Sequence, residues 1–440
     1  MLISELLLDK PENKICVMLH DDSMTYGQLE KLSNDMAKTL LVKGLSKEDR
    51  VLVCEKDFLR QLVCFFAVIK AGGVCVLFPD SASDDERAAF ALKQNIKIQI
   101  DGSLAILPFK ENCPKLSADD IFLGALSSGT TGEAKLILRD HKSWMAAFPE
   151  QSRIFNLKNN DVLYLVGSLS YTANLNACMH AFFEGATVAF SKSRMPRTWI
   201  KEIKNFGVTA LFMVPANYKI LLSKINEQIE NITSAVSGGA KMDRETAEKL
   251  IEVFPQANIV EYYGASELGH ITYSDRHDLL THPDSVGKAF PGVSIKLDNG
   301  KIFVESPYIV PSLHPVAIAG DIGHLDDEGY LTLLGRENGI INVAGNKVVL
   351  QQVEKTIKKN SRVSDVVVIG IKDGLKGEKV CAFVVKKDET LQTKDLVHFC
   401  HENMNRYSCP QKFVFINEIP VNNNGKTDFR LLREMTGEHE

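Results

Sequence analysis

The sequence predicts an α/β fold: a large N-terminal domain of layered sheets, followed by a small α+β domain. Apolar runs of strand length alternate with amphipathic stretches of helix length over most of the chain. The C-terminal segment instead has strand-like runs around two helical stretches, as expected for a unit with its own core. We place the joint between domains 1–336 and 337–440, where charge, Asn and Gly interrupt two apolar segments.

Size and composition limit the possible functions. The 440 residues exceed what one core usually needs, and 45% hydrophobic with 24% charged residues is typical of a soluble globular protein. A net charge of -5 gives no electrostatic reason to expect nucleic acid or a membrane as partner. Glu5 and Asp9 interrupt the apolar N-terminus, so we expect no signal peptide.

The nine cysteines form no CxxC pair and mostly lie in apolar runs, which indicates reduced, buried thiols and a cytoplasmic location. His398, Cys400 and His401 could suggest a metal site. However, Leu396, Cys400 and Met404 share one stripe of a helix, so we expect Cys400 to face a core.

Individual elements follow from local patterns. The apolar run 64–78 is broken by Lys70 and two glycines and is too short to span a bilayer. Segment 243–254 predicts a helix with Asp243 as N-cap and apolar residues at helical spacing. Segments 208–214 and 257–263 predict buried strands that end in polar or glycine-rich turns, where ligands gather in open α/β sheets.

The small domain is expected to start with a hairpin-like stretch at 329–345. A helix with Leu350, Val353 and Ile357 on one face should follow. We then expect strands at 364–371 and 379–385, a helix at 393–404 and a strand at 412–416.

The stretch LSSGTTGEAKLIL, residues 126–138, predicts a phosphate-binding turn between two strands. Ser127, Ser128, Thr130 and Thr131 supply hydroxyls, and Lys135 supplies positive charge. Gly129 and Gly132 allow the backbone to approach a ligand closely. A solvated hairpin turn is the alternative, although such a turn needs fewer residues of this kind.

A second loop, PVNNNGKTDFR, contains Lys426. Neither loop has Walker spacing, since Pro420 stands where that motif needs glycine, and a P-loop kinase is therefore disfavoured.

Eight segments, in order along the chain, resemble the acyl-adenylate-forming superfamily of acyl- and aryl-CoA synthetases, luciferases and peptide-synthetase adenylation domains. Each match is weak alone, but the ordered set is specific. The matching segments are MTYGQLEKLSNDMAKTL, IKAGGVCVLFPD, SSGTTGEAK with His141 following, SGGA at 237–240, YGASE at 263–267, Gly320-Asp321, GRENGIINVAGNK and PVNNNGK.

The resemblance implies an ATP-dependent ligase that forms an acyl-AMP and then passes the acyl group to a thiol. Both reactants of the first step are anions, so positive charge must bring them together. By resemblance, Lys426 bridges the carboxylate and the α-phosphate, Glu267 and Thr130 hold Mg²⁺, and His141 is a further catalytic group. The implied ATP-binding residues are Ser127, Ser128, Gly129, Thr130, Thr131, Gly132, Lys135, Gly238, Gly239, Ala240, Tyr263, Gly264, Ser266, Asp321 and Arg336.

Several positions depart from the family pattern. Asn338 stands at the hinge where Asp or Lys is usual, so a charged lock on one domain pose is missing. Ala134 replaces a frequent proline, and Ala319 replaces a frequent threonine. The resemblance implies a distorted barrel-like subdomain within the large domain and a mobile small domain. The region before the phosphate loop is short for the family.

The resemblance also places the acid and the thiol acceptor. The acid pocket is expected to include Tyr171, Asn174, Val214 and Tyr262. Members of the family that activate amino acids usually have an Asp near position 171, which binds the α-ammonium. Tyr171 stands there in this chain, which disfavours an α-amino acid and favours an aryl or short functionalised carboxylic acid. Gly345 and Lys347 resemble the lining of the thiol tunnel, with CoA or the phosphopantetheinyl group of an acyl carrier protein as acceptor.

Two other functions stay open at this point. One is a stand-alone adenylation enzyme that loads a carrier protein in a biosynthetic cluster. The other is an inactive nucleotide-binding scaffold, which the presence of Glu267, Asp321, Arg336 and Lys426 argues against. Monomer and homodimer are equally compatible with the sequence.

Overall fold

The computed structural model describes residues 1–20, 22–79, 82–102, 113–128, 134–336, 339–343, 346–373, 377–421 and 427–437. They divide into two compact units. The first comprises Met1–Ile295, Val304–Ala317 and Asp327–Leu331, and the second comprises Lys296–Phe303, Ile318–Asp326 and Thr332–Glu440. Some segments before residue 336 thus group with the C-terminal part, and the domain joint placed after residue 336 stays a prediction.

A nine-stranded sheet forms the centre of the first unit, in the order β14-β13-β12-β11-β10-β8-β9-β1-β2. The strands from β12 to β1 in this order run parallel, and β13 pairs antiparallel with β12. The predicted strands at 208–214 and 257–263 are β10 and β12. The bounds are β1 (Ile15–Met18), β2 (Ser23–Thr25), β8 (Val162–Val166), β9 (Thr187–Ser191), β10 (Ala210–Met213), β11 (Ser234–Gly238), β12 (Asn258–Ala265), β13 (Gly269–Ser274) and β14 (Lys288–Ala289).

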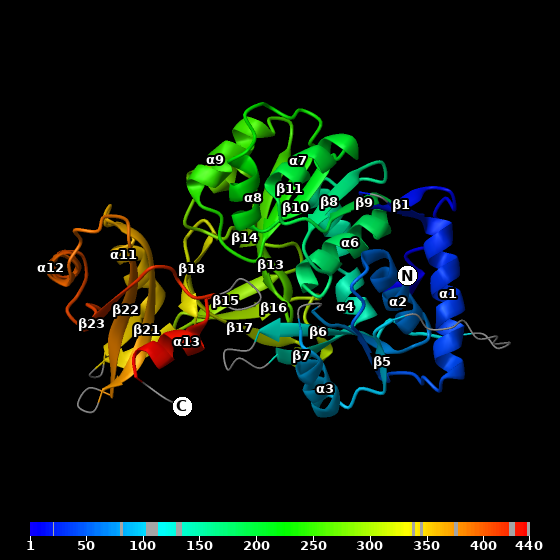
Figure 1. Cartoon of the computed structure of the whole chain (residues 1–440), viewed down its shortest axis with the longest axis horizontal. Coiled ribbons are helices and arrows are strands. Elements are labelled where there is room, and N and C mark those ends of the chain that lie inside the picture. Colours follow the sequence, from blue (N-terminus) through cyan, green and yellow to red (C-terminus); the bar gives the residue numbers. More distant parts are fainter. Residues whose placement is uncertain are drawn as a thin grey trace. The chain divides into compact units, whose positions relative to one another are not determined.

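Each parallel strand is apolar on both sides because it separates two cores. In β10, Leu211 and Met213 pack with α7, α8 and α9, whereas Phe212 packs on the opposite face, with α5 and α6. Figure 1 shows α8 and α9 over one face of the sheet and α6 on the other. The helices are α5 (Phe148–Phe155), α6 (Thr172–Glu184), α7 (Pro196–Asn205), α8 (Pro215–Leu222), α9 (Arg244–Val253) and α10 (Arg276–Thr281).

The prediction of a capped helix at 243–254 is confirmed by α9. The Asp243 carboxylate accepts a 2.8 Å hydrogen bond from the Thr246 N–H, which satisfies one of the free donors of the first turn. Ala247 and Leu250 are buried in the core under the sheet.

A second sheet of five strands, β5-β3-β4-β6-β7, completes the first unit. Its strands β6 and β7 form the antiparallel hairpin expected around the hydroxyl-rich stretch, with Ser128 opposite Ala134. The bounds are η1 (Ile3–Glu5), α1 (Tyr26–Val42), β3 (Arg50–Val53), α2 (Phe58–Lys70), β4 (Val74–Leu77), α3 (Asp84–Lys93), β5 (Ile98–Ile100), β6 (Ile121–Ser128), β7 (Ala134–Asp140) and α4 (His141–Met145).

The apolar run 64–78 proves to be the end of α2, a glycine turn and β4. Gly72 has φ +82°, a backbone angle that favours glycine, so the chain can reverse there. Among the described residues, none of the helices combines the length and the apolar character needed to cross a bilayer. All nine cysteines are free thiols, and Cys113 alone is more than slightly exposed.

Two further sheets have most of their residues in the second unit. One is β15-β16-β17-β18, and the other is β20-β19-β22-β21 with β23 beside β22. The bounds are β15 (Ser294–Asp298), β16 (Lys301–Glu305), β17 (Val316–Leu325), β18 (Leu331–Arg336), β19 (Ile340–Val343), β20 (Asn346–Val349), α11 (Leu350–Ile357), β21 (Val363–Asp373), β22 (Gly377–Lys386), α12 (Thr393–Asn403), β23 (Lys412–Ile416) and α13 (Phe429–Met435), while η2 (Pro311–Leu313) belongs to the first unit.

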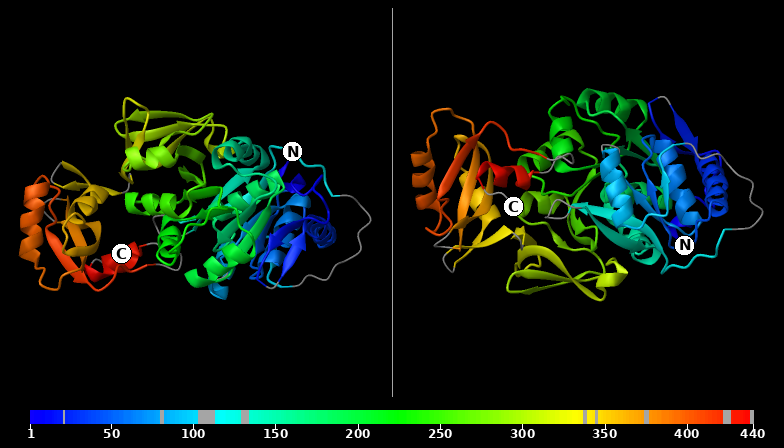
Figure 2. Two further views of the ribbon diagram at one scale, coloured as in Figure 1. Left: turned by 90° about the horizontal axis from the view of Figure 1, so that it is seen from above. Right: turned by 60° about the horizontal axis from the view of Figure 1, so that its bottom comes forward.

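The C-terminal sheet has helices on both faces. Leu350, Val353 and Ile357 of α11 are buried on one face, together with Leu396 and Cys400 of α12. Leu432 of α13 packs on the opposite face. Figure 2 shows α12 in orange and α13 in red on opposite sides of these strands. The prediction that Cys400 faces a core is therefore confirmed.

The expected hairpin at 329–345 is wrong. Strand β18 pairs with β17 in one sheet, whereas β19 pairs with β20 and β22 in the other, so the chain changes sheets between Arg336 and Ile340. Two neighbouring apolar runs with Asn and Gly between them are typical of a hairpin in sequence. Only the strand pairing shows whether they form one hairpin or belong to two different sheets, as here.

Replacing the N-cap of α9 tests the local origin of this helix. We expect Asp243→Ala to destabilise α9 by about 1 kcal/mol, and Asp243→Asn to cost less because the amide oxygen still accepts from Thr246. Hydrogen exchange of the peptide covering 243–254 measures the effect, with Glu252→Ala on the same helix as control. Equal exchange in Asp243→Ala and the control would contradict the assignment.

Candidate active site

The carboxyl ends of three adjacent parallel strands bring together residues from three separate sequence segments. Val214 follows β10, Gly238 ends β11, and Tyr262 lies opposite Gly238 on β12. This is the edge at which ligands bind in open α/β sheets. The turn 237–240, to which the resemblance assigns ATP binding, therefore lies beside Val214 and Tyr262. Tyr171 lies here too, because a Cβ on Gly239 would meet its hydroxyl.

Close packing at this edge leaves no room for side chains on the glycine turn. A Cβ at Gly238 would lie 2.7 Å from the Tyr262 ring, and a Cβ at Gly239 would lie 2.3 Å from the Tyr171 hydroxyl. Gly239 also has φ +87°, which favours glycine. The two glycines thus allow two tyrosines to contact the backbone of the turn.

A buried carboxylate anchors the residues after the turn. Glu261 of β12 is 2% exposed and lies 2.5 Å from the Lys241 ammonium, and its carboxylate also accepts the Met242 N–H. Burial raises the pKa of Glu261, while Lys241 lowers it. Sequence reasoning missed this residue, although a lone Glu within the apolar run ANIVEYY was a usable signal.

A buried guanidinium holds the next turn, which contains Ser266 and Glu267. Arg139 of β7 is 1% exposed, and its Nη1 donates to the carbonyl oxygens of Ser266 at 3.2 Å and Glu267 at 3.5 Å. Burial lowers the pKa of Arg139 to about 10. The Glu267 side chain itself is half-buried. Sequence reasoning also missed Arg139, although a charged residue directly after the apolar run LIL could have indicated it.

Close approach of two backbone strands is enough to require glycine at position 264, with no ligand involved. A Cβ there would lie 2.3 Å from the Gly269 carbonyl oxygen, because β12 and β13 approach each other at an irregular register. Tyr263 beside it is half-buried.

His141 lies in the core of the first unit. It is 1% exposed, its Nδ1 accepts the Ile3 N–H at 3.1 Å, and its ring stacks on Phe122 at 4.7 Å. Burial lowers its pKa to about 4, so the ring is neutral near pH 7. These contacts pack His141 into the core at the start of α4, and its expected catalytic role stays a prediction.

Asn174 also has a different place from the one expected. Its Nδ2 donates to the carbonyl oxygens of Val166 and Ser168, each at 3.1 Å, so its amide nitrogen fixes the end of β8. Asn174 is 5% exposed, whereas Tyr171, just before α6, is 39% exposed. Tyr171 is therefore the more accessible residue of this pair, and the substrate-pocket role of both stays a prediction.

The structure describes only the two strands on either side of the predicted phosphate-binding turn. Ser127 of β6 lies opposite Lys135 of β7, and Lys135 is exposed. The side chains of Ser127 and Ser128, and the whole of Gly129, Thr130, Thr131 and Gly132, lie outside the described residues, as do Asn338, Gly345 and Lys426. Their roles stay predictions.

Asp321 and Arg336 belong to the second unit and form an ion pair across neighbouring strands. The Arg336 Nε lies 2.9 Å from Asp321 Oδ1. The Asp321 side chain is only 10% exposed and that of Arg336 is 70% exposed. The arginine can therefore orient the carboxylate and still reach solvent. Lys347 of β20 is exposed.

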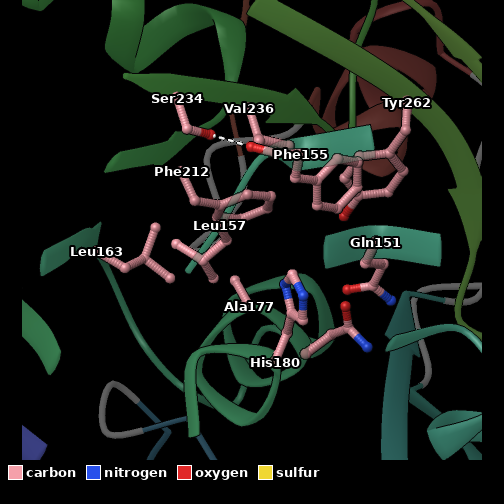
Figure 3. Close-up of a pocket in the computed structure, with 11 residues that line it drawn as sticks. Gln151, Phe155, Leu157, Leu163, Ala177, His180, Phe212, Ser234, Val236 and Tyr262 are labelled. Carbon is pink, nitrogen blue, oxygen red and sulfur yellow. Dashed lines mark hydrogen bonds between the residues drawn. The ribbon is translucent and has the colours of Figure 1, made fainter. Parts of the chain in front are cut away.

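A cavity lies between α5 and α6 on one side and β8, β10, β11 and β12 on the other, and its lining extends from Ser234 at the start of β11 to Tyr262 opposite the end of that strand. The enclosed space is about 20 Å³, room for about one water-sized group, and the total is about 330 Å³ when the region open to solvent is included. Figure 3 shows Gln151 and His180 on one side, with the rings of Phe155 and Tyr262 opposite. None of these except Tyr262 was expected from the sequence, because they come from helices that carry no recognisable motif.

Gly239→Ala should disturb the strand-end site through two effects, the Tyr171 contact and the backbone angle. We expect at least tenfold loss of kcat/KM for ATP, and only partial recovery in Gly239→Ala with Tyr171→Phe, since the φ strain persists. Acid-dependent exchange of labelled pyrophosphate into ATP measures this. Full activity in Gly239→Ala would contradict the close packing.

Buried neutral histidines should make the fold sensitive to acid. Burial lowers the pKa of His141 to about 4 and those of His180 and His270 to about 3, below the ordinary value of about 6.5. Protons then bind the unfolded chain more readily, so stability is complete above pH 6.5 and is lost as the pH falls toward 4. Each histidine lowers the free energy of unfolding by about 2 kcal/mol when the pH falls from 7 to 5.

Urea midpoints between pH 7 and 4.5 test this. We expect His270→Phe, which keeps an aromatic ring beside Tyr262 and Phe290, to flatten the dependence, and His277→Asn at an exposed position to leave it unchanged. An identical slope in wild type and His270→Phe would count against the assignment.

Comparisons with known proteins give the family. The model of the AMP-binding enzymes matches residues 7–101 and 97–305, and that of the AMP-binding enzyme C-terminal domain matches residues 352–426. The uncharacterized acyl–CoA ligase YhfT of Bacillus subtilis is 25% identical, with 94% of this chain and 93% of that protein covered. The putative long chain fatty acid–CoA ligase VraA of Staphylococcus epidermidis is also 25% identical, with the same coverage.

Solved structures share the fold. ATP-bound MatB from Rhodopseudomonas palustris superimposes with a TM-score of 0.86 at 23% identity, with 99% of each chain covered. The o-succinylbenzoate CoA synthetase MenE of Bacillus subtilis, in complex with its acyl-adenylate intermediate, has a TM-score of 0.85 at 20% identity, covering 100% of this chain and 98% of that one. The predicted α/β class, with a large N-terminal and a small C-terminal domain, is thereby confirmed. Because the family models span most of its length, the chain belongs to the AMP-binding enzymes, in agreement with the predicted membership of the acyl-adenylate-forming superfamily.

Proposed function

We propose that this protein is an ATP-dependent ligase that converts a carboxylic acid to an acyl-adenylate and then to a thioester of CoA. The observation that carries the proposal is the match of family models to both parts of the chain, the second of which ends at Lys426. The relatives named as acyl–CoA ligases support CoA as the thiol acceptor.

The described residues suit the binding of a nucleotide. Gly238 and Gly239 present bare backbone beside Tyr171 and Tyr262, which can receive a flat base or the acid. Asp321, oriented by Arg336, offers carboxylate oxygens for ribose hydroxyls. These groups lie on strands and strand ends, which hold them more firmly than free loops would.

Magnesium fits the donor set around Glu267. This ion usually takes one or two protein carboxylates and completes its shell with phosphate oxygens and water. The Glu267 carbonyl oxygen accepts hydrogen bonds from Arg139 and from the Val310 N–H. These bonds fix the backbone from which its half-buried side chain extends. Bound there, the ion would neutralise charge on the phosphates.

Lys426 is proposed to bring the carboxylate and the α-phosphate together. Its ammonium would neutralise two anions that otherwise repel each other, as a compact charge on a flexible stem can. We further propose that it leaves the site when the small domain turns for the thioester step, with Asn338 as hinge and Gly345 and Lys347 along the thiol path.

The half-reactions separate these roles. We expect Lys426→Ala to lower acid-dependent pyrophosphate–ATP exchange by at least a hundredfold, because adenylation alone needs the lysine between the two anions. Thioester formation from a supplied acyl-AMP and CoA should stay within about threefold of wild type. Lys394→Ala, at an exposed position of α12, is the matched control and should affect neither step.

Three outcomes would contradict parts of the proposal. Equal loss of both half-reactions in Lys426→Ala excludes the two-pose scheme. Transfer to a carrier protein but not to CoA identifies a carrier-loading enzyme. Absence of exchange with every acid of a broad panel favours the nucleotide-binding scaffold.

A further inference from the structure

A buried glutamine at the cavity between α5, α6 and the central sheet has no hydrogen-bond partner in the part of the chain that the structure describes. Gln151 of α5 is 0% exposed, and neither its Oε1 nor its Nε2 has a hydrogen-bond partner among the described residues. Buried polar groups in native proteins are almost always paired, so each exception needs an explanation. Leu or Met would fill this position without that cost.

Gln151 borders a cavity rather than solid core. The cavity lies between α5 and α6 on one side and strands β8, β10 and β11 on the other, and Gln151 and His180 both line it. In Figure 3 the Gln151 amide and the His180 ring lie close together and face the same space. An amide aimed into a cavity has both a donor and an acceptor available to an occupant.

The polar side of the cavity is electrically neutral. The described residues that line it include no Asp, Glu, Lys or Arg. Burial lowers the pKa of His180 to about 3, so its imidazole is uncharged near pH 7. The ring contacts Ser152 Oγ through Nε2 at 2.9 Å, and Ser152 Oγ lies 2.5 Å from Glu184 as a donor. Nε2 then donates to Ser152, and the other ring nitrogen is an acceptor.

The opposite walls of the cavity are flat and aromatic. The rings of Phe155 and Tyr262 lie 5.8 Å apart at 28°, and those of Phe212 and Tyr262 lie 6.3 Å apart at 25°. Such nearly parallel faces suit a planar group. Tyr262 also contacts the Gly238 backbone, so one side chain borders both the cavity and the strand-end site.

We propose that the cavity receives the distal part of the acid, and that Gln151 selects an aryl acid bearing a neutral hydrogen-bonding substituent, such as a hydroxyl or carboxamide, away from the reacting carboxylate. This inference rests on the proposed function, since it assumes that the strand-end site holds the carboxylate. It names Gln151 as a specificity-determining residue. A charged distal group would have no counter-ion there and is excluded.

Matched acid pairs test the inference through pyrophosphate–ATP exchange. The pairs are benzoate with meta- and para-hydroxybenzoate and with para-carbamoylbenzoate, and cinnamate with para-hydroxycinnamate. Terephthalate supplies a charged distal group. We expect wild type to favour a polar member over its parent by roughly tenfold or more in kcat/KM, since sites built to hydrogen-bond a substituent reject analogues that lack it. Terephthalate should be the poorest aryl substrate.

Two variants remove the amide while filling its space. In Gln151→Leu and Gln151→Met we expect kcat/KM for the preferred polar acid to fall roughly tenfold, with that for its apolar parent unchanged or raised. Melting temperatures should not fall, because an unpaired buried amide is lost. Arg153→Gln, exposed on the same helix, is the matched control and should keep the wild-type preference.

The outcomes separate the two levels of proposal. If no acid supports exchange in wild type, the proposed function fails. If wild type activates acids but treats polar and apolar partners within about twofold, and Gln151→Leu changes neither, a buried water satisfies the amide and this inference alone is overturned. A variant that melts well below wild type also overturns it, because Gln151 would then be paired in the protein itself.

Discussion

The candidate site depends on the approach of two tyrosines to bare backbone at the ends of β11 and β12. Gly238 and Gly239 have no Cβ, and any Cβ would overlap the Tyr262 ring or the Tyr171 hydroxyl. The parallel register that sets Gly238 opposite Tyr262 fixes this contact within the sheet. A ligand that binds here would meet backbone groups and aromatic faces held by two neighbouring parallel strands.

Two buried charges keep the neighbouring turns in position. Glu261 fixes the residues after the glycine turn through Lys241 and Met242, and Arg139 fixes the turn before Glu267 through two carbonyl oxygens. Breaking the buried Glu261–Lys241 pair would leave an uncompensated charge and is therefore costly, so the residues after the glycine turn have few alternative conformations. Both residues act by positioning, since their described contacts are to protein groups.

In the proposed role, the cavity supplies the chemical selectivity of this arrangement. Its aromatic walls are continuous with the strand-end site through Tyr262, while Gln151 and the neutral His180 supply hydrogen-bonding capacity without charge. Shape and neutrality together restrict the acid more than the family motifs do. The motifs bind the nucleotide and the reacting carboxylate. Because these two groups are the same for every acid, the motifs cannot distinguish one acid from another.

The sequence by itself determined the fold class, most of the tested elements and the family. Periodicity located α9 and its Asp243 cap, because capping is a local interaction, and eight ordered motifs identified the superfamily. The tertiary structure decided what depends on contacts between distant segments. It separated β18 from β19, placed His141 against Ile3, committed Asn174 to the end of β8, and brought Gln151 to the cavity. Strand pairing and burial are non-local, and a side chain's partners 100 residues away leave no periodic trace in the chain.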